Sequence, residues 1–323
     1  MAIITKREGV KKISLGFFIL STILIGLCST SITASTTYEP ALNKGTVAFR
    51  VIQYNEGKWE DTVESELEPD DFFGGDSDEI GARSKVTIKN VGSQDWDLED
   101  ALLFIFDVES YIDDDELNET EMLLLLTFLS KDYVDEVYPE EHDVWEALSV
   151  KWDFETDEFD EAPDDRAYIL PIFKDPKDYK DLLDDYNKWA LSLNTTMVYL
   201  GIKPFPIFDG DGLLWVLITS GIFTIARPFN SYLETLIDEL DCDDAEIKEN
   251  TLILERKGVE DYTVEVTFNE QGLQSNLLIK NDEGRVIYEI IQDNTDMIVL
   301  VVSGVIAASV AGLLIVLIKR RKN

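Results

Sequence analysis

The chain has 323 residues, of which 45% are hydrophobic and 29% charged, so it can bury the core of one large domain or two small ones. Its net charge is −37, and the segment 36–296 holds 20 basic against 64 acidic residues, a net of −44. This charge repels the phosphates of nucleic acids and excludes a nucleic-acid-binding protein, whereas cations and basic partners are attracted.

The N-terminal end has the order of a secretory signal peptide. A basic segment, residues 6–12, precedes the uncharged 16-residue run Ile13–Cys28, and small and hydroxylic residues follow. Sixteen helical residues span roughly 24 Å, less than the roughly 30 Å of a bilayer core. We therefore predict a signal peptide over residues 1–35, cleaved after Ala34 or Ser35, with an uncleaved signal anchor as the alternative.

Strand patterns dominate the start of the exported domain, which we place at residues 36–296. Thr46–Tyr54 is rich in β-branched and aromatic residues and Lys85–Lys89 alternates between polar and apolar, so we predict a strand at each. We expect a long exposed loop over the acidic stretch Glu60–Gly81. The apolar run Ala101–Phe106 is interpreted as a buried strand.

Two segments in the middle of the chain predict helices. Asp175 followed by Pro176 is typical of a helix start, because aspartate can cap and proline fits the first helical position. Apolar residues then recur mostly at steps of three or four, which indicates one buried stripe. These residues are Tyr179, Leu182, Leu183, Tyr186, Ala190 and Leu193. A second helix with the same pattern starts near Pro228 and carries Phe229, Tyr232, Leu233, Leu236, Ile237 and Leu240.

Between these helices, residues 212–226 form an uncharged, largely apolar run that is too short to cross a bilayer upright. One interpretation is a buried strand or core helix. The other is an apolar wall for a ligand, or a surface that dips into the membrane. Under the second interpretation, the candidate ligand-binding residues are Trp215, Ile218, Phe223 and Ile225.

The C-terminal part of the domain predicts an antiparallel meander of four strands. The strands are expected at Thr251–Arg256, Tyr262–Phe268, Leu273–Lys280 and Arg285–Ile291. Two four-residue turns end in Gly272 and Gly284, which supply the positive φ that such hairpins often need. One face of the meander is apolar and must be covered, most simply by the two helices. The predicted fold class is α+β, with a curved antiparallel sheet covered by two or more helices.

The C-terminal end predicts a membrane anchor. Residues 297–318 are 22 uncharged residues, roughly 33 Å as a helix, and the basic tail 319–323 follows. The excess of lysine and arginine places this tail in the cytoplasm and the acidic domain outside the cell. Gly304, Ala308 and Gly312 recur at four-residue spacing, which would allow two such helices to pack closely as a homodimer.

Few residues suggest catalysis, and we expect no enzyme. His142 is the only histidine and lies in an acidic stretch where we expect it to be exposed, which excludes two-histidine metal sites. Cys242 is flanked by aspartates that disfavour a thiolate. The chain has no glycine-rich phosphate loop. A hydrolase that uses two carboxylates is the remaining catalytic alternative.

Two further kinds of site are suggested by short patterns. Asp113, Asp115 and Glu119 lie in an acidic run and are candidate Ca²⁺ ligands, because hard cations prefer carboxylate oxygens. The helical calcium-loop pattern is absent there, so a solvated loop without any cofactor is the alternative. Asn118 and Asn194 begin Asn-X-Thr sequons and are candidate glycosylation sites on an exported chain.

Three features together resemble the archaeal cell-surface proteins described as having a choice-of-anchor architecture. They are the signal peptide, the acidic domain that ends in the meander 262–291, and the C-terminal helix with its basic tail; Tyr168–Pro171 adds to the likeness. The resemblance implies anchoring at the cell surface and no assigned activity. More loosely, a curved sheet closed by helices is similar to the half-barrel of lipoprotein-carrier and lipid-sensing domains.

Two functions of the exported domain therefore compete. The first is an interaction module that displays an acidic surface to an extracellular partner or to cations. The second is a carrier or sensor that holds a lipid or another apolar ligand between the curved sheet and its helices. We favour the first, because a continuous apolar run is more often core than pocket.

Overall fold

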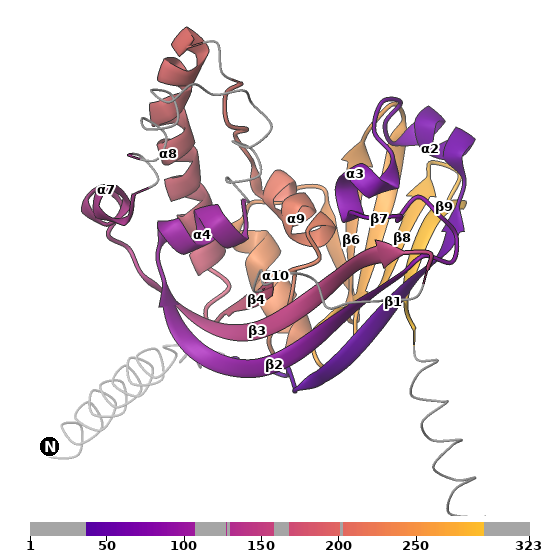
Figure 1. Cartoon of the computed structure of the whole chain (residues 1–323), viewed down its shortest axis with the longest axis horizontal. Coiled ribbons are helices and arrows are strands. Elements are labelled where there is room, and N and C mark those ends of the chain that lie inside the picture. The colour runs from indigo at the N-terminus through magenta and orange to yellow at the C-terminus, as the bar shows by residue number, and fades with distance from the viewer. Residues whose placement is uncertain (1–36, 107–126, 128–129, 158–167, 201–202, 294–323) are drawn as a thin grey trace, which may run out of the picture. The chain divides into compact units, whose positions relative to one another are not determined.

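A computed structural model describes residues 37–106, 127, 130–157, 168–200 and 203–293 of the chain (Figure 1). The described residues from Tyr38 to Asp293 belong to one compact unit, to which the following description refers. The predicted signal peptide and the predicted anchor at 297–318, with Gly304, Ala308 and Gly312, lie outside the described residues. Among the helices that are described, none is long and apolar enough to cross a membrane.

Nine antiparallel strands form one sheet in the order β4-β3-β2-β1-β9-β8-β7-β6-β5. The first four are β1 (Gly45–Tyr54), β2 (Arg83–Trp96), β3 (His142–Glu155) and β4 (Tyr168–Phe173). The others are β5 (Ala245–Lys248), β6 (Thr251–Lys257), β7 (Asp261–Phe268), β8 (Gln274–Asn281) and β9 (Val286–Asp293). Each half of the sheet is a meander in chain order, and the pairing of β1 with β9 joins the two halves.

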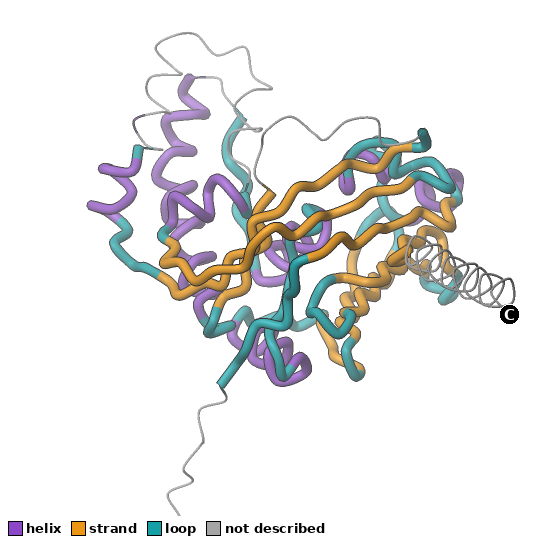
Figure 2. The backbone as a smooth tube through the Cα atoms, turned by 60° about the horizontal axis from the view of Figure 1, so that its bottom comes forward, coloured by secondary structure: helices purple, strands orange, loops and turns teal. Residues whose placement is uncertain are grey.

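The sheet is strongly curved and forms a half-barrel, as Figures 1 and 2 show. The curvature is clearest in β2 and β3, which are 14 residues long each. Their pairing is shifted at two places, between Arg83 and Lys85 and between Ile88 and Asn90. Such bulges bend a strand and increase its twist, so the long strands can wrap around a core.

The predicted C-terminal meander is confirmed. In β7 the four residues Tyr262, Val264, Val266 and Phe268 are at most 6% exposed, and the alternating positions between them are only partly buried. The structure adds the short edge strand β5, which the sequence did not predict. The predicted strands at Thr46–Tyr54 and Lys85–Lys89 correspond to β1 and β2.

Helices gather on the concave side of the sheet (Figure 1). They are α2 (Glu56–Thr62), α3 (Pro69–Phe73), α4 (Leu98–Phe104), α7 (Lys131–Val137), α8 (Asp178–Leu200), α9 (Gly210–Thr219) and α10 (Phe229–Glu239). Every residue of the stripe predicted for α8 is at most 3% exposed. In α10, Tyr232, Leu233 and Leu236 are fully buried. The structure therefore confirms an α+β domain with a curved antiparallel sheet covered by helices.

Two predictions about the first half of the chain are wrong. Ala101–Phe106 is not a strand but largely belongs to α4, where Asp97 caps the helix by accepting a 3.2 Å hydrogen bond from Asp100 N. A continuous apolar run fits a strand or a helix, and here the capping box at the start of α4 favours the helix. The stretch Glu60–Gly81 is not one exposed loop, because it contains the end of α2 and all of α3. Phe73 of α3 is buried and stacks on Tyr288 of β9.

Candidate functional site

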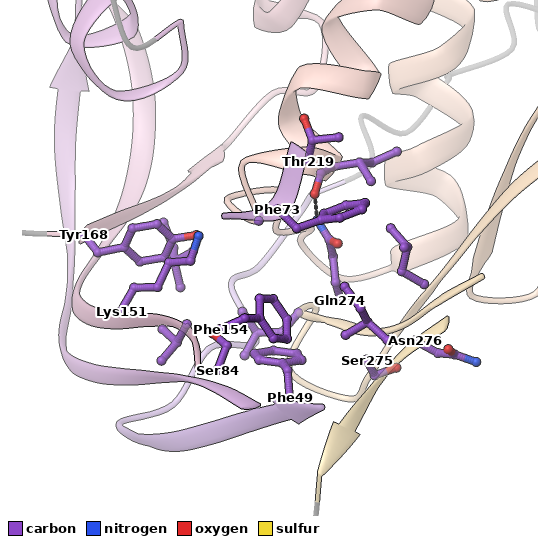
Figure 3. A pocket seen from close by; sticks show the side chains of 17 residues that line it. Phe49, Phe73, Ser84, Lys151, Phe154, Tyr168, Thr219, Gln274, Ser275 and Asn276 are labelled. Atoms are coloured by element: carbon purple, nitrogen blue, oxygen red, sulfur yellow. Dashed lines mark hydrogen bonds between the residues drawn. The ribbon is translucent and has the colours of Figure 1, made fainter. Parts of the chain in front are cut away.

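A half-open pocket of about 80 Å³ lies between the concave face of the sheet and the C-terminal end of α9 (Figure 3). Strands β1, β2, β3, β4, β8 and β9 contribute to it, together with Phe73 of α3 and Ile218 and Thr219 of α9. Its position follows from the fold, because the curved sheet surrounds the end of the helix from several sides.

The pocket is lined mainly by apolar side chains. Phe49 of β1 and Phe154 of β3 lie together on one side of it, and Phe73 lies opposite them (Figure 3). Val86, Phe154 and Phe73 are each at most 7% exposed, so the lining belongs to the hydrophobic core of the domain. An apolar concave surface of this kind favours a hydrocarbon or aromatic group over water.

A bulge in β3 places both Lys151 and Phe154 at the pocket. Side chains three apart on a regular strand point to opposite faces. Lys85 pairs with Trp152 whereas Arg83 pairs with Glu155, so β3 carries one extra residue between these two pairs. The extra residue reverses the alternation, and both side chains consequently face the concave side.

Lys151 provides a cation inside this apolar surface. Its side chain is 20% exposed, and its Nζ lies 3.9 Å from Asp153 Oδ1 and 5.3 Å from the centre of the Tyr168 ring. Burial lowers the pKa of Lys151, and the nearby Asp153 carboxylate only partly offsets this effect. The ammonium group is therefore poorly solvated, and the Asp153 carboxylate neutralises its charge only in part.

Most neutral polar side chains of the pocket bond to the backbone of the domain, whereas the buried Oδ1 of Asn276 has no hydrogen-bond partner among the described residues. Tyr168 donates its hydroxyl hydrogen to Ser220 O at 3.1 Å, and burial raises the pKa of this hydroxyl, so it stays protonated. Gln274 Nε2 donates to Ile218 O at 3.3 Å, and this bond links β8 to α9 (Figure 3). Ser84 Oγ donates to the carbonyl oxygen of Trp152 at 2.7 Å. These bonds hold the sheet and the end of α9 around the pocket.

Of the four residues predicted to contact a ligand, Ile218 lines this pocket. Phe223 packs edge-to-face against Phe268, with ring centres 5.2 Å apart, and Ile225 is fully buried. Trp215 is half-buried, and the Arg256 guanidinium lies 4.6 Å from the centre of its ring. The run 212–226 is thus α9 followed by a buried segment, mostly as the core interpretation predicts.

Sequence reasoning missed Lys151 and Tyr168, which come from the consecutive strands β3 and β4, and Gln274, which comes from the distant strand β8. The alternation in β3 identifies Lys151 only when the bulge is known. Tyr168 was noted only for the likeness to surface proteins. No local pattern connects these residues, because only the pairing and curvature of the sheet bring them to one pocket.

The predicted metal ligands Asp113, Asp115 and Glu119, and the sequon residue Asn118, lie outside the described residues. Among the residues that are described, no group of three or more histidine, cysteine, aspartate or glutamate side chains is arranged to hold a metal ion. Cys242 is a half-buried free thiol whose pKa is raised by burial and by the neighbouring Asp211 and Asp209.

Asn194, the second sequon residue, lies in α8 and is bonded to the segment that follows the helix. Its Nδ2 donates to Phe205 O at 2.9 Å, and its Oδ1 accepts from Phe205 N at 2.7 Å. Asn187, two turns earlier, makes the same pair of bonds with Phe208. The two asparagines therefore hold an extended segment against α8, and glycosylation of Asn194 stays a prediction.

His142 was expected to be exposed, and this is wrong. It is 5% exposed at the start of β3, and its Nδ1 lies 3.8 Å from Asp178 Oδ1 at the start of α8. Its ring lies edge-on to Phe173, with centres 6.1 Å apart. The acidic neighbours in the sequence suggested solvent, but the apolar ring and one carboxylate from a distant helix enclose it.

No protein-family model matches this chain, and neither a curated protein nor a solved structure matches it. The resemblance to choice-of-anchor surface proteins therefore stays a prediction.

Proposed function

We propose that this chain is a single-pass surface protein, anchored by residues 297–318, whose exported domain is a non-enzymatic binding module. The module binds a small apolar group in the pocket between α9 and the concave face of the sheet. The observation that carries this proposal is the apolar lining from strands in both halves of the sheet, which surrounds the end of one helix.

The bonds of the polar groups support binding rather than catalysis. Tyr168, Gln274 and Ser84 each donate to a backbone carbonyl of the domain itself. A catalytic hydroxyl or amide must instead be directed at the reacting atoms. Groups that are committed to the backbone serve to shape the pocket, which is what a binding module requires.

The size of the pocket supports a small ligand more than a whole lipid. Sites for drug-sized ligands occupy roughly 300–1,000 Å³, and this one has about 80 Å³. A buried water needs about 10–15 Å³ of cavity volume, so the pocket has room for several non-hydrogen atoms. The module is thus better suited to recognising a small molecule than to carrying a lipid.

The charge of the domain supports its display outside the cell. A net of −44 over residues 36–296 keeps the domain soluble and away from anionic lipid headgroups. The same surface attracts cations and basic partners, so an extracellular partner can be bound there in addition to a ligand in the pocket.

The full-length protein, purified in phospholipid nanodiscs, tests the proposal. Thr219→Trp fills the pocket at its α9 wall, and Val198→Trp places the same side chain at a site of α8 that is 63% exposed. Small molecules released on denaturation are identified by mass spectrometry. We expect a compound from the wild type and Val198→Trp that is missing from Thr219→Trp. Identical release from all three proteins, or no compound from any, would contradict the proposal.

A further inference from the structure

We propose that the ligand of this pocket is a small organic monocarboxylate, whose hydrocarbon part contacts the apolar lining and whose carboxylate pairs with the Lys151 ammonium. This inference rests on the proposed function, since it names the chemical class that the same pocket would take. Its premise is the placement of one cation in a surface that is otherwise uncharged.

Among the 17 described residues that line the pocket, Lys151 is the only one with a charged side chain. The chain as a whole has 65 acidic against 28 basic residues. A lining with one cation and no carboxylate is therefore opposite in sign to the rest of the domain. This local charge selects an anion over a neutral or cationic ligand of the same shape.

The ammonium of Lys151 has unused capacity for hydrogen bonds. It has three N–H donors, and its one ionic contact among the described residues is the 3.9 Å approach to Asp153. That distance is longer than the roughly 2.7–2.9 Å of a charge-assisted hydrogen bond. A carboxylate in the pocket can make such a bond and replace the water that burial removes from the ammonium group.

The dimensions and the single cation limit the anion to a small monocarboxylate. One ammonium neutralises one negative charge, whereas phosphate sites usually combine several donors or an arginine fork. Lys151 and Tyr168 lie on one side of the pocket, and Phe154 and Phe49 lie nearby with no charge between them (Figure 3). A ligand with its carboxylate at Lys151 therefore directs its hydrocarbon part toward the phenylalanines.

The net negative charge of the domain weakens long-range attraction of any anion, but it does not cancel the local pairing. Exposed charges that lie more than about 10 Å away are largely screened at 0.1 M salt. Lys151 is mostly buried, so its interaction with a bound carboxylate is screened much less. Higher salt is thus expected to reduce repulsion by the surface more than attraction by Lys151.

The experiment compares pentanoate with pentan-1-ol, which have hydrocarbon chains of similar size and differ in charge. Binding to the full-length protein in phosphatidylcholine nanodiscs is measured by isothermal titration calorimetry, with empty nanodiscs subtracted. We expect pentanoate to bind about tenfold more tightly than pentan-1-ol, as a hydrogen bond between charged groups suggests. In Lys151→Met this preference should disappear while pentan-1-ol still binds.

The matched control is Lys85→Met. Lys85 lies on β2 between Ser84 and Val86, which line the pocket, so its side chain faces the opposite side of the sheet. This variant removes the same charge at a site outside the pocket and should keep the pentanoate preference. Should Lys151→Met not fold, Lys151→Gln provides the same comparison with a polar side chain.

A measurement on the wild type alone gives an independent readout. Pentanoate affinity should fall as the pH rises through the pKa of Lys151, which burial sets below its ordinary value, because the ammonium then loses its charge. Affinity for pentan-1-ol should not change over this range.

The outcomes separate this inference from the proposed function. Equal binding of pentanoate and pentan-1-ol, unchanged in Lys151→Met but lost in Thr219→Trp, would overturn the carboxylate and leave the binding module. Equal loss of pentanoate binding in Lys151→Met and Lys85→Met would attribute the preference to general charge and also overturn it. Absence of binding by either compound, together with no released compound in the nanodisc experiment, would overturn both.

Discussion

The hydroxyl of Tyr232 donates a 2.9 Å hydrogen bond to the carbonyl oxygen of Phe173, 59 residues earlier in the chain. Tyr232 lies in α10, and Phe173 is the last residue of the edge strand β4. Both side chains are fully buried, and the ring of Tyr38 lies edge-on to Tyr232 with centres 5.2 Å apart. One helix of the C-terminal half is therefore bonded to the outermost strand of the N-terminal half.

We predict that Tyr232→Phe lowers the free energy of unfolding by about 1–2 kcal/mol, because it removes a buried hydrogen bond while keeping the ring. The matched control is Tyr199→Phe, since Tyr199 is 88% exposed and its change should stay within about 0.5 kcal/mol. Urea unfolding measures both values. Equal stability of the two variants would show that the bond to Phe173 contributes little.

His142 predicts a pH dependence of stability. Its burial opposes protonation, but Asp178, Glu140 and Asp181 together outweigh this effect, so the pKa of His142 is raised. A raised pKa stabilises the fold fully at pH values below the ordinary histidine pKa. This contribution is lost as the pH rises through the raised value in the folded protein.

We expect the free energy of unfolding of the wild type to decrease over this pH window and His142→Gln to lack the decrease. Asp178→Asn should also reduce it, because the partner charge is removed. Urea unfolding at a series of pH values measures the effect. A decrease of the same size in His142→Gln would assign it to other groups.

The two turn glycines of the meander have the same backbone conformation but different surroundings. Gly272 and Gly284 have φ values of +77° and +74°, so alanine is strained at either position, by about 1–3 kcal/mol. A Cβ at Gly284 would meet open space, whereas at Gly272 it would overlap the carbonyl oxygen of Ile225. The Gly272 carbonyl also accepts a 3.0 Å hydrogen bond from Ile225 N, which restricts movement of the turn.

We therefore predict that Gly272→Ala destabilises the domain clearly more than Gly284→Ala does. Thermal unfolding of the two variants measures the difference. Equal losses would mean that backbone strain alone determines the cost and that the contact between the turn and the segment after α9 adjusts freely.

The predicted topology is tested by protease added to intact cells. The predicted signal peptide at residues 1–35 and the basic tail at 319–323 both predict an exported domain and a cytoplasmic C-terminus. We expect digestion of the acidic domain and protection of a small C-terminal fragment, detected with a C-terminal tag. A domain that is digested only after lysis would reverse the orientation.

The sequence alone determined the elements whose pattern is local. The alternation in Tyr262–Phe268 predicts a strand with one buried face, and the stripe from Tyr179 to Leu193 predicts a helix, because each period places the apolar side chains on one side. Ala101–Phe106 carries no such period, so its helix could not be told from a strand. The signal peptide and the anchor stay predictions, which rest on the length and flanking charge of the two ends of the chain.

Only the tertiary structure determined the environment of Lys151 and His142. Lys151 faces the pocket because of a bulge in β3, and it lies beside Tyr168 because β3 pairs with β4. His142 is buried because α8 brings Asp178 to the start of β3. Each of these contacts joins residues from separate elements, and the energy of placing a charge depends on such neighbours rather than on the adjacent sequence. The pairing of β1 with β9, which unites the two meanders, is non-local in the same sense and brings β8 and β9 to the same pocket as β1, β2, β3 and β4.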